Sequence, residues 1–240
     1  MASVTNEFYN DNASLLARQY LSTSFEEVHA SWLPHLNQLF DHHVSGLSIL
    51  DVGAGIGRDA AYLAQHCSSQ HTPAEQKVDV VAVEPAHILA DLGKKYTKGQ
   101  NVTWIVDSLP RLNRLTIYQN GFNLILLSAV WMHIPPNERC VALQTLENLL
   151  APHGKLVISL RHGPNNDTRV MHPVSVDELQ TIAKRAHLTV VDSSDRDTDK
   201  LGRTQVFWET VVLQRANDPV ANPIANSQVE SAPPVNGSPE

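Results

Sequence analysis

The segment ILDVGAGIGRDAAYLA, residues 49–64, places an acid, Asp51, directly before a glycine-rich turn and a helix-like pattern. Such a turn between a strand and a helix lets a ligand meet free backbone amides, which favour anions. Gly55, Gly57 and Ala60 even fit the GxGxxA spacing of dinucleotide sites. A pyrophosphate there would be repelled by the Asp51 carboxylate, whereas an ammonium group would be attracted. The acid therefore favours a cationic ligand without phosphate.

The elements that must position this turn alternate in type along the chain. Strand-like runs LSIL, VDVVAVE, NVTWIV, FNLILLS and KLVISL alternate with helix-like runs at 58–66, 86–95, 137–150 and 176–186. This alternation predicts βαβ units and a parallel sheet. VVAV and LILL are apolar at successive positions, as expected for strands covered on both faces. LTVVDSS and TQVFWETVVLQ have no helix between them and predict a terminal antiparallel pair.

The residues before the first strand have a helical apolar pattern from about Asn12 to Phe40, with a Ser-Thr-Ser break at 22–24. We expect two helices there. After about Arg215 the composition shifts to Pro, Asn, Ser and Ala, which predicts a disordered tail. CSSQHTPAEQK, residues 67–77, reads as an exposed loop. The predicted organisation is a helical lid at 1–43, a catalytic domain at 44–215 and a tail at 216–240.

S-adenosylmethionine fits the ligand that Asp51 requires, because it carries an α-ammonium, a sulfonium and no phosphate. The segment 50–57 also resembles the DxGxGxG signature of class I S-adenosylmethionine-dependent methyltransferases. Further matches follow in the family's order in VVAVEP, IVDSLP, FNLILLSAVWMHI and LLAPHGKLVISL. Ile56 departs from the family's usual Thr, Ser or Cys, and the 67–77 loop is longer than its norm.

The resemblance implies an α/β fold: a Rossmann-like, doubly wound, seven-stranded, mostly parallel sheet with an antiparallel terminal pair. It also implies S-adenosylmethionine as donor and S-adenosylhomocysteine as product. Glu84 would then bind both ribose hydroxyls through its two acceptor oxygens, and Asp107 the adenine amino group. Arg58 would pair with the methionine carboxylate or be solvated. The donor-binding residues expected on this basis are Asp51, Gly53, Ala54, Gly55, Arg58, Glu84, Pro85, Asp107, Ser108, Leu109 and Ser128.

Two histidines are the catalytic candidates on the acceptor side. His133, which by resemblance lies at the mouth of the cleft, has an ordinary pKa that suits a general base at neutral pH. It could equally pack against the donor without moving a proton. His162 follows the fifth strand, at the strand end that lines the ligand crevice in open α/β sheets. Together with Arg161 and His172 it could recognise a carboxylate or another anionic group, or it could be a turn residue.

Three aromatic residues complete the predicted acceptor site. Tyr9, Tyr20 and Trp131 could place a ring near the sulfonium or a cationic amine, although ordinary packing of an amphipathic helix explains them better.

Charge and composition exclude several function classes. The net charge of -7 argues against a nucleic-acid partner, which would need clustered Lys and Arg. Cys67 and Cys140 offer no CxxC pair, and the 12 histidines have no HxH or HExxH spacing, so no metal site is expected. No apolar window approaches the roughly 20 residues that span a bilayer, so we expect a cytoplasmic protein without membrane contact.

The sequence therefore predicts an enzyme that methylates an oxygen or nitrogen atom of a small molecule. An RNA or protein substrate is the first alternative, although MHIPPNER resembles the signature of base and glutamine methyltransferases only superficially. A nicotinamide-dependent oxidoreductase would bring phosphates close to Asp51. A non-catalytic binding partner would have no physical need for unpaired carboxylates at Asp51, Glu84 and Asp107.

Overall fold

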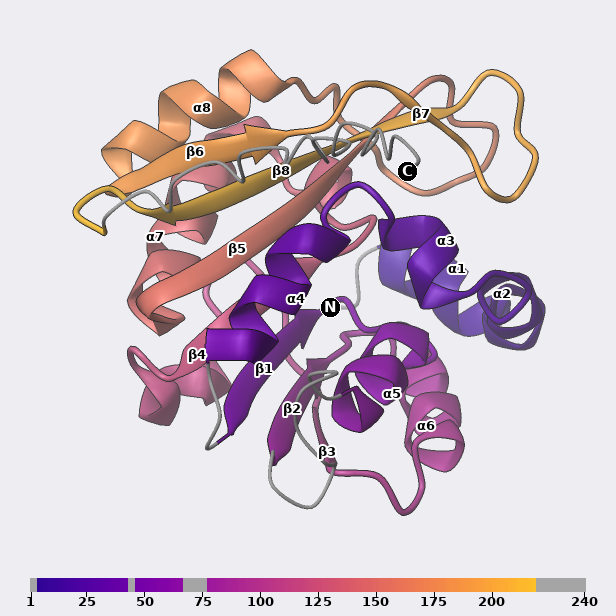
Figure 1. The fold of residues 1–240 in the computed structure, drawn as a ribbon. Helices are drawn as coiled ribbons and strands as arrows, with labels where there is room; N and C mark the ends of the chain where they lie inside the picture. Colours follow the sequence, from indigo (N-terminus) through magenta and orange to yellow (C-terminus); the bar gives the residue numbers. More distant parts are fainter. Residues whose placement is uncertain (1–3, 43–45, 67–76, 219–240) are drawn as a thin grey trace, which may run out of the picture.

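One mixed sheet forms the centre of the computed structural model, which describes residues 4–42, 46–66 and 77–218 (Figure 1). Its strands are β1 (Leu47–Val52), β2 (Val78–Val83), β3 (Val102–Ile105), β4 (Phe122–Leu127), β5 (Leu150–His162), β6 (Leu188–Ser193), β7 (Asp197–Thr198) and β8 (Phe207–Arg215). The order is β3-β2-β1-β4-β5-β8-β6, with the short β7 paired to β8. β1 to β5 run parallel, and β8 lies antiparallel to both β5 and β6. The predicted parallel sheet and terminal antiparallel pair are confirmed, and the two residues of β7 add an eighth strand.

The helices alternate with the strands as predicted, except before β1. The α-helices are α1 (Val4–Asp11), α2 (Ala13–Tyr20), α3 (Phe25–His29), α4 (Leu33–His42), α5 (Arg58–Gln65), α6 (His87–Tyr96), α7 (Arg139–Leu149) and α8 (Val176–Arg185). Three 3-10 turns, η1 (Asn113–Tyr118), η2 (Trp131–His133) and η3 (Pro136–Glu138), lie in the connections around β4.

The prediction of two helices before β1 is wrong, because four short helices fill this part of the chain. The predicted break at 22–24 is present. Ser24 caps α3 there: its hydroxyl accepts from the Glu27 backbone N–H, and the Glu27 carboxylate accepts from the Ser24 N–H. The apolar spacing continues across the short turns, so periodicity alone did not show where one helix ends and the next begins.

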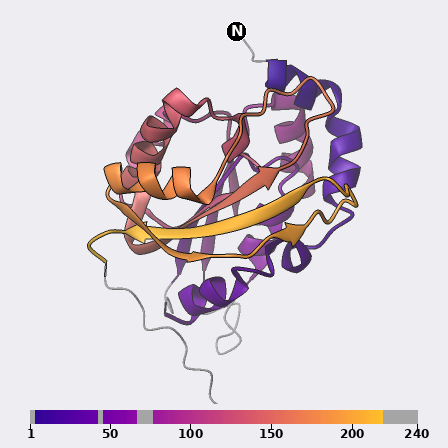
Figure 2. The same cartoon turned by 90° about the horizontal axis from the view of Figure 1, so that it is seen from above.

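Both faces of the sheet are buried, which explains the continuous apolar runs. Val81 and Val83 face one core cluster with α7 and α8, whereas Val80 and Ala82 face a second cluster with α4 and α5. Figure 2 shows α7 and α8 on one side of the sheet and α4 on the other. α4 therefore covers a face of the sheet. The other three N-terminal helices, α1 to α3, lie near the carboxyl ends of the parallel strands.

Helix α6 is held close to the sheet edge by a glycine. Trp104 on β3 packs against Gly93, and its indole N–H donates to the Thr97 hydroxyl at 2.9 Å. A Cβ atom at Gly93 would lie 2.2 Å from the Trp104 ring. Any side chain at this position must therefore displace the ring or the helix.

We predict that Gly93→Ala lowers the free energy of unfolding by ~1–3 kcal/mol, the usual cost of overpacking. The clash outweighs the roughly 1 kcal/mol that alanine gains over glycine inside a helix. Urea denaturation measures the difference. Lys95→Ala, on the exposed side of α6, is the matched control and should change stability by less than ~0.5 kcal/mol. An unchanged or raised denaturation midpoint for Gly93→Ala would contradict the predicted clash.

Some predictions concern residues that the structure does not describe, and others concern membrane spans and metal sites. Cys67, His43, most of the predicted 67–77 loop and the predicted tail from residue 219 onward lie outside the described residues. Within the described ranges, no helix has the length and apolar character needed to cross a bilayer. The same ranges contain no group of three or more His, Cys, Asp or Glu side chains placed to hold a metal ion.

Candidate active site

A cavity of about 670 Å³ lies at the carboxyl ends of the parallel strands, where open α/β sheets bind their ligands. The ends of β1, β2 and β5 line it, together with the segments that follow β1, β2, β3 and β4. Residues of α1, α2 and α3 also line it. The cavity is therefore bounded by the sheet on one side and by the first three helices on another.

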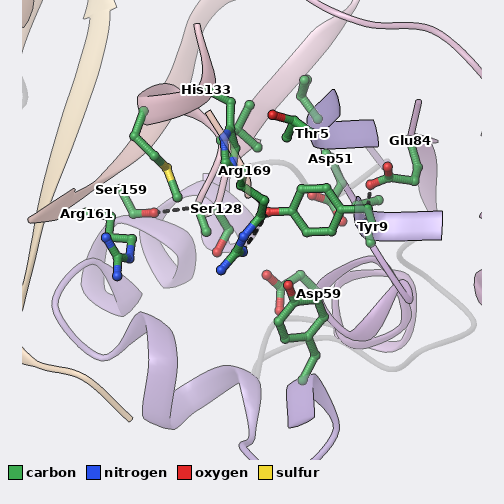
Figure 3. A pocket seen from close by; sticks show the side chains of 18 of the residues that line it. Thr5, Tyr9, Asp51, Asp59, Glu84, Ser128, His133, Ser159, Arg161 and Arg169 are labelled. Carbon is green, nitrogen blue, oxygen red and sulfur yellow. Dashed lines mark hydrogen bonds between the residues drawn. The ribbon is translucent and has the colours of Figure 1, made fainter. Parts of the chain in front are cut away.

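Every predicted donor-binding residue lines this cavity. Of the predicted acceptor-side residues, five line it as well: Tyr9, Tyr20, His133, Arg161 and His172. Figure 3 shows Glu84 and Asp51 toward one end, Arg161 and Ser159 at the other, and Tyr9 and Arg169 between them.

Two predicted residues do not reach the cavity. Trp131 is fully buried in the core against α7, with the Arg139 guanidinium over its ring at 5.8 Å. The side chain predicted to offer an aromatic face there packs in the core instead and does not line the cavity. His162 stacks on Phe207 and lies 2.8 Å from Glu209, so it borders a second, smaller cavity instead.

The glycine turn after β1 brings backbone amides to the cavity wall. Gly53 has φ of +73°, and a Cβ atom there would lie 2.4 Å from Val130 Cγ2, so the turn has no room for a side chain. The Gly53 N–H donates to the Val83 carbonyl at 2.8 Å, and the Gly55 N–H donates to Glu84 Oε2 at 2.9 Å. These bonds fix the turn against the end of β2 and place Glu84 beside it.

Asp51 and Glu84 form an acidic end of the cavity. Asp51 is 1% exposed, and its Oδ2 has no hydrogen-bond partner among the described residues. Burial, and then the charge of Asp59, raise the pKa of Asp51 well above its ordinary value. Burial also raises the pKa of Glu84 to about 7, although the Ala86 and Gly55 amides oppose this shift. A cation placed here would relieve both carboxyl groups.

Asp59 differs from Asp51 because both of its carboxylate oxygens have side-chain partners, the Arg58 guanidinium and the His29 ring. The Arg58 Nε donates to Asp59 Oδ1 at 2.7 Å, and His29 Nε2 lies 2.9 Å from Asp59 Oδ2. The Trp32 indole N–H donates to His29 Nδ1, so the His29 proton lies on Nε2 and is donated to Asp59. Burial alone would raise the pKa of Asp59, but His29 and Arg58 hold it well below its usual range.

Arg58 also joins the glycine-turn helix to the helices above the cavity. Its Nη1 donates to the Thr23 hydroxyl at 2.8 Å and to the Tyr20 carbonyl at 3.3 Å. Asp107, at the adenine position expected from the family resemblance, accepts from the Ser108 and Arg114 amides at 2.8 and 2.7 Å. Both side chains therefore have protein partners that hold them in place at the wall.

His133 belongs to a chain of polar groups that crosses the cavity. Its Nδ1 lies 2.8 Å from the Val170 carbonyl, which can only accept, so Nδ1 carries the proton. The Tyr9 hydroxyl lies 3.0 Å from Nε2 and donates to it, while it accepts from Arg169 Nη1 at 3.1 Å. Arg169 is paired in turn with Asp167 at 2.6 Å. Burial lowers the pKa of His133, and a hydrogen bond to the Val170 carbonyl partly opposes that shift.

This chain also links α1 to the segment between β5 and α8. Besides the Tyr9–Arg169 bond, the Thr5 hydroxyl accepts from the Val170 N–H at 3.0 Å, and the Arg169 guanidinium lies over the rings of Phe8 and Tyr9. α1 therefore docks on a segment about 160 residues away in sequence.

Several cavity residues were not found from the sequence. They include Thr5, His29, Asp59, Ser159, Arg169, residues 197–201 and Arg203. Asp59 and Ser159 lie within predicted elements, at the start of α5 and near the end of β5, so a search for polar residues at these element ends could have found them. Arg169 lies in a segment without regular structure, and the sequence has no pattern that points to it.

Comparison with known proteins gives one family match and several similar folds. A family model described as a methyltransferase domain matches residues 24–195. The 1,6-didemethyltoxoflavin-N1-methyltransferase of Burkholderia thailandensis, crystallised with 1,6-didemethyltoxoflavin and S-adenosylhomocysteine, has a similar structure: TM-score 0.56, 22% identity, 90% of this chain and 92% of that chain covered.

Two further solved structures are similar. The magnesium protoporphyrin IX methyltransferase of Synechocystis, with bound S-adenosylhomocysteine, has a TM-score of 0.59 at 12% identity and covers 88% of this chain and 97% of its own. An S-adenosylmethionine-dependent methyltransferase from Mesorhizobium loti has a TM-score of 0.57 at 15% identity, over 77% and 98%. No curated protein sequence matches the chain.

Proposed function

Because the chain belongs to the class I S-adenosylmethionine-dependent methyltransferases, we propose that it transfers the donor's methyl group to an oxygen or nitrogen atom of a small molecule. The observation that carries this proposal is the orphaned, buried Oδ2 of Asp51 at the wall of a large cavity. A buried carboxylate without a partner is costly, and the α-ammonium of the donor would satisfy it.

The other predicted donor contacts suit the same ligand. Each Glu84 oxygen accepts one backbone N–H and keeps a second lone pair, so the carboxylate can still accept from a vicinal diol. Asp107 likewise keeps acceptor capacity for an amino group. A dinucleotide would instead place its phosphates against Asp51, which disfavours a nicotinamide cofactor.

When bound, the donor would supply a methyl group on its sulfonium sulfur. The acceptor atom displaces the sulfur in line, and the donor leaves as the neutral thioether S-adenosylhomocysteine. The protein's part is alignment, exclusion of water and, for a protonated acceptor, removal of a proton. We assign the last role to His133, because its lone pair lies on Nε2 inside the cavity and its lowered pKa keeps the ring neutral at pH 7. In the structure the Tyr9 hydroxyl occupies the position at Nε2 that an acceptor hydroxyl or amine would take.

The lid consists of α1 to α3 in this proposal, a shorter segment than the 1–43 expected from the sequence. These helices line the cavity, while α4 covers a face of the sheet. Tyr9, Thr5 and the Arg58–Thr23 bond tie the lid to both ends of the cavity. A closed lid excludes water during transfer.

A small-molecule acceptor fits the space. The cavity volume of about 670 Å³ lies within the range of small-molecule sites, and it must hold donor and acceptor together. The similar enzymes from Burkholderia thailandensis and Synechocystis are named after small molecules, 1,6-didemethyltoxoflavin and magnesium protoporphyrin IX.

Incubation of the full chain with methyl-labelled S-adenosylmethionine and pools of phenols, amines and carboxylic acids tests the proposal. We expect label in at least one small-molecule product and stoichiometric formation of S-adenosylhomocysteine. Label appearing only in added RNA or protein would contradict the small-molecule assignment.

A further inference from the structure

The cavity wall also contains basic side chains besides Arg58. Four basic side chains line it from β5 and from the segments at 163–175 and 197–203: Arg161, Arg169, Lys200 and Arg203. Figure 3 shows Arg161 at the far end from Glu84 and Arg169 between them, and Asp197 and Asp199 also line the cavity.

Three of these four cations are neutralised by an aspartate of their own. Arg169 pairs with Asp167. Lys200 lies 2.9 Å from Asp197, and Arg203 lies 2.5 Å from Asp199. In each pair the two partners lie within four residues in sequence, so the segments carry their own counter-ions.

Arg161 is the exception. It is 91% buried, and among the described residues no carboxylate lies within ion-pair distance of its guanidinium. Its Nη1 donates to the Gly163 carbonyl at 3.3 Å and contacts the Met171 sulfur at 3.6 Å, and its Nη2 donates to the Pro164 carbonyl at 2.9 Å. Its Nε–H has no acceptor within the described part of the chain. One positive charge is thus left without a counter-ion.

The position of Arg161 makes that charge available to a ligand. The residue lines the main cavity and also a second hollow of about 290 Å³, which Met132 and His172 share with it. Figure 3 shows it beside Ser159, at the far end from Glu84. Burial, and then the charges of Arg203 and Arg169, lower the pKa of Arg161, and the more distant carboxylates of Asp199 and Asp167 only partly oppose this shift.

We propose that the methyl acceptor carries a carboxylate group and that Arg161 binds it. The inference rests on the proposed function and narrows its substrate class. A guanidinium offers a planar fork that matches a carboxylate, and a buried charge without a partner is stabilised when one arrives. The one positive charge of Arg161 would be neutralised by one negative charge on the ligand. The carboxylate at Arg161 would anchor the acceptor so that its reacting atom lies toward His133 and the donor.

Matched acids and amides test this on the wild-type protein saturated with S-adenosylhomocysteine. Benzoate, 4-hydroxybenzoate and 4-aminobenzoate are titrated calorimetrically beside the corresponding amides. We expect at least one acid to bind ~10- to 100-fold more tightly than its amide, the usual effect of charge-assisted hydrogen bonds. Equal affinities of acids and amides, or no binding of any acid, would overturn the inference.

Variants of Arg161 separate this inference from the proposed function. Arg161→Gln should abolish the preference for the acid, and Arg161→Lys should restore part of it because the charge is retained. Arg185→Gln, on the exposed side of α8, is the matched control and should keep the full preference. S-adenosylhomocysteine affinity is measured on the wild type and on every variant. If the wild type did not bind S-adenosylhomocysteine, the proposed function would be refuted. If the wild type bound S-adenosylhomocysteine but did not prefer acids to amides, only the role of Arg161 would be refuted.

Discussion

Asp51→Asn is expected to weaken S-adenosylhomocysteine binding ~100-fold, because it removes the carboxylate that faces the ligand's ammonium. Truncating one partner of a buried, hydrogen-bonded charge pair costs ~2–5 kcal/mol. The substitution preserves size and shape, so the loss reports charge and not packing. Calorimetric titration at pH 8, where the Asp51 carboxyl is most ionised, measures it.

The same substitution should not destabilise the protein without ligand. The folded-state pKa of Asp51 is raised, so above its ordinary pKa the unfolded state loses its proton more readily, and ionised Asp51 opposes folding. Removing the charge should leave the thermal midpoint at pH 8 unchanged or raise it, with a gain of ~1 kcal/mol. Asp91→Asn, on the exposed side of α6, is the control. Binding by Asp51→Asn within threefold of the wild type would contradict the assigned ammonium contact.

His133→Gln is expected to lower kcat ~10²- to 10⁴-fold, the range for loss of a general base, while donor affinity changes less than threefold. Glutamine can still donate to the Val170 carbonyl, so the loop should stay in place. The pH profile gives an independent readout. Burial lowers the pKa of His133 below the ordinary histidine value of 6.5. The wild-type kcat should therefore stay constant as the pH falls to 6.5 and decrease only below pH 6.5, where the base becomes protonated.

Two controls distinguish proton transfer from packing. Tyr9→Phe removes the hydroxyl on Nε2 but keeps the ring of α1 in place, so it should reduce kcat far less than His133→Gln. His87→Gln, at an exposed position of α6, should have no effect. If His133→Gln kept its kcat and raised only KM, His133 would be a cleft residue that packs against its ligands, the alternative that the sequence left open.

The acidic side of the site could be predicted from the sequence because each of its residues lies at the end of a recognisable strand or just after it. Parallel strands end at the same edge of a sheet, so Asp51, Glu84 and Asp107 had to converge once the strands were identified. The glycines between Asp51 and α5 are equally local, since the turn leaves no space for a side chain at Gly53.

The acceptor end could not be predicted in the same way, because its geometry depends on contacts between distant, irregular segments. Arg169 reaches Tyr9 across 160 positions, and the segment that carries it has no helix or strand. Trp131 and Tyr9 are both aromatic residues near the predicted cleft, yet the backbone buries one in the core and places the other at the cavity. Sequence spacing gave the position of each residue but not the direction of its side chain.

Titration of the full chain with S-adenosylhomocysteine at pH 6 and pH 8, with NADH as the comparison ligand, tests the central claim that the acidic end binds the donor. We predict one micromolar site for S-adenosylhomocysteine and none for NADH, with tighter binding at pH 8. The pKa of Glu84 is about 7 and that of Asp51 is also raised, so both carboxyl groups are more protonated at pH 6 than at pH 8. The ligand binds their ionised forms, so binding at pH 6 must release protons and is therefore weaker. Absence of binding at both pH values, or binding of NADH instead, would contradict the account.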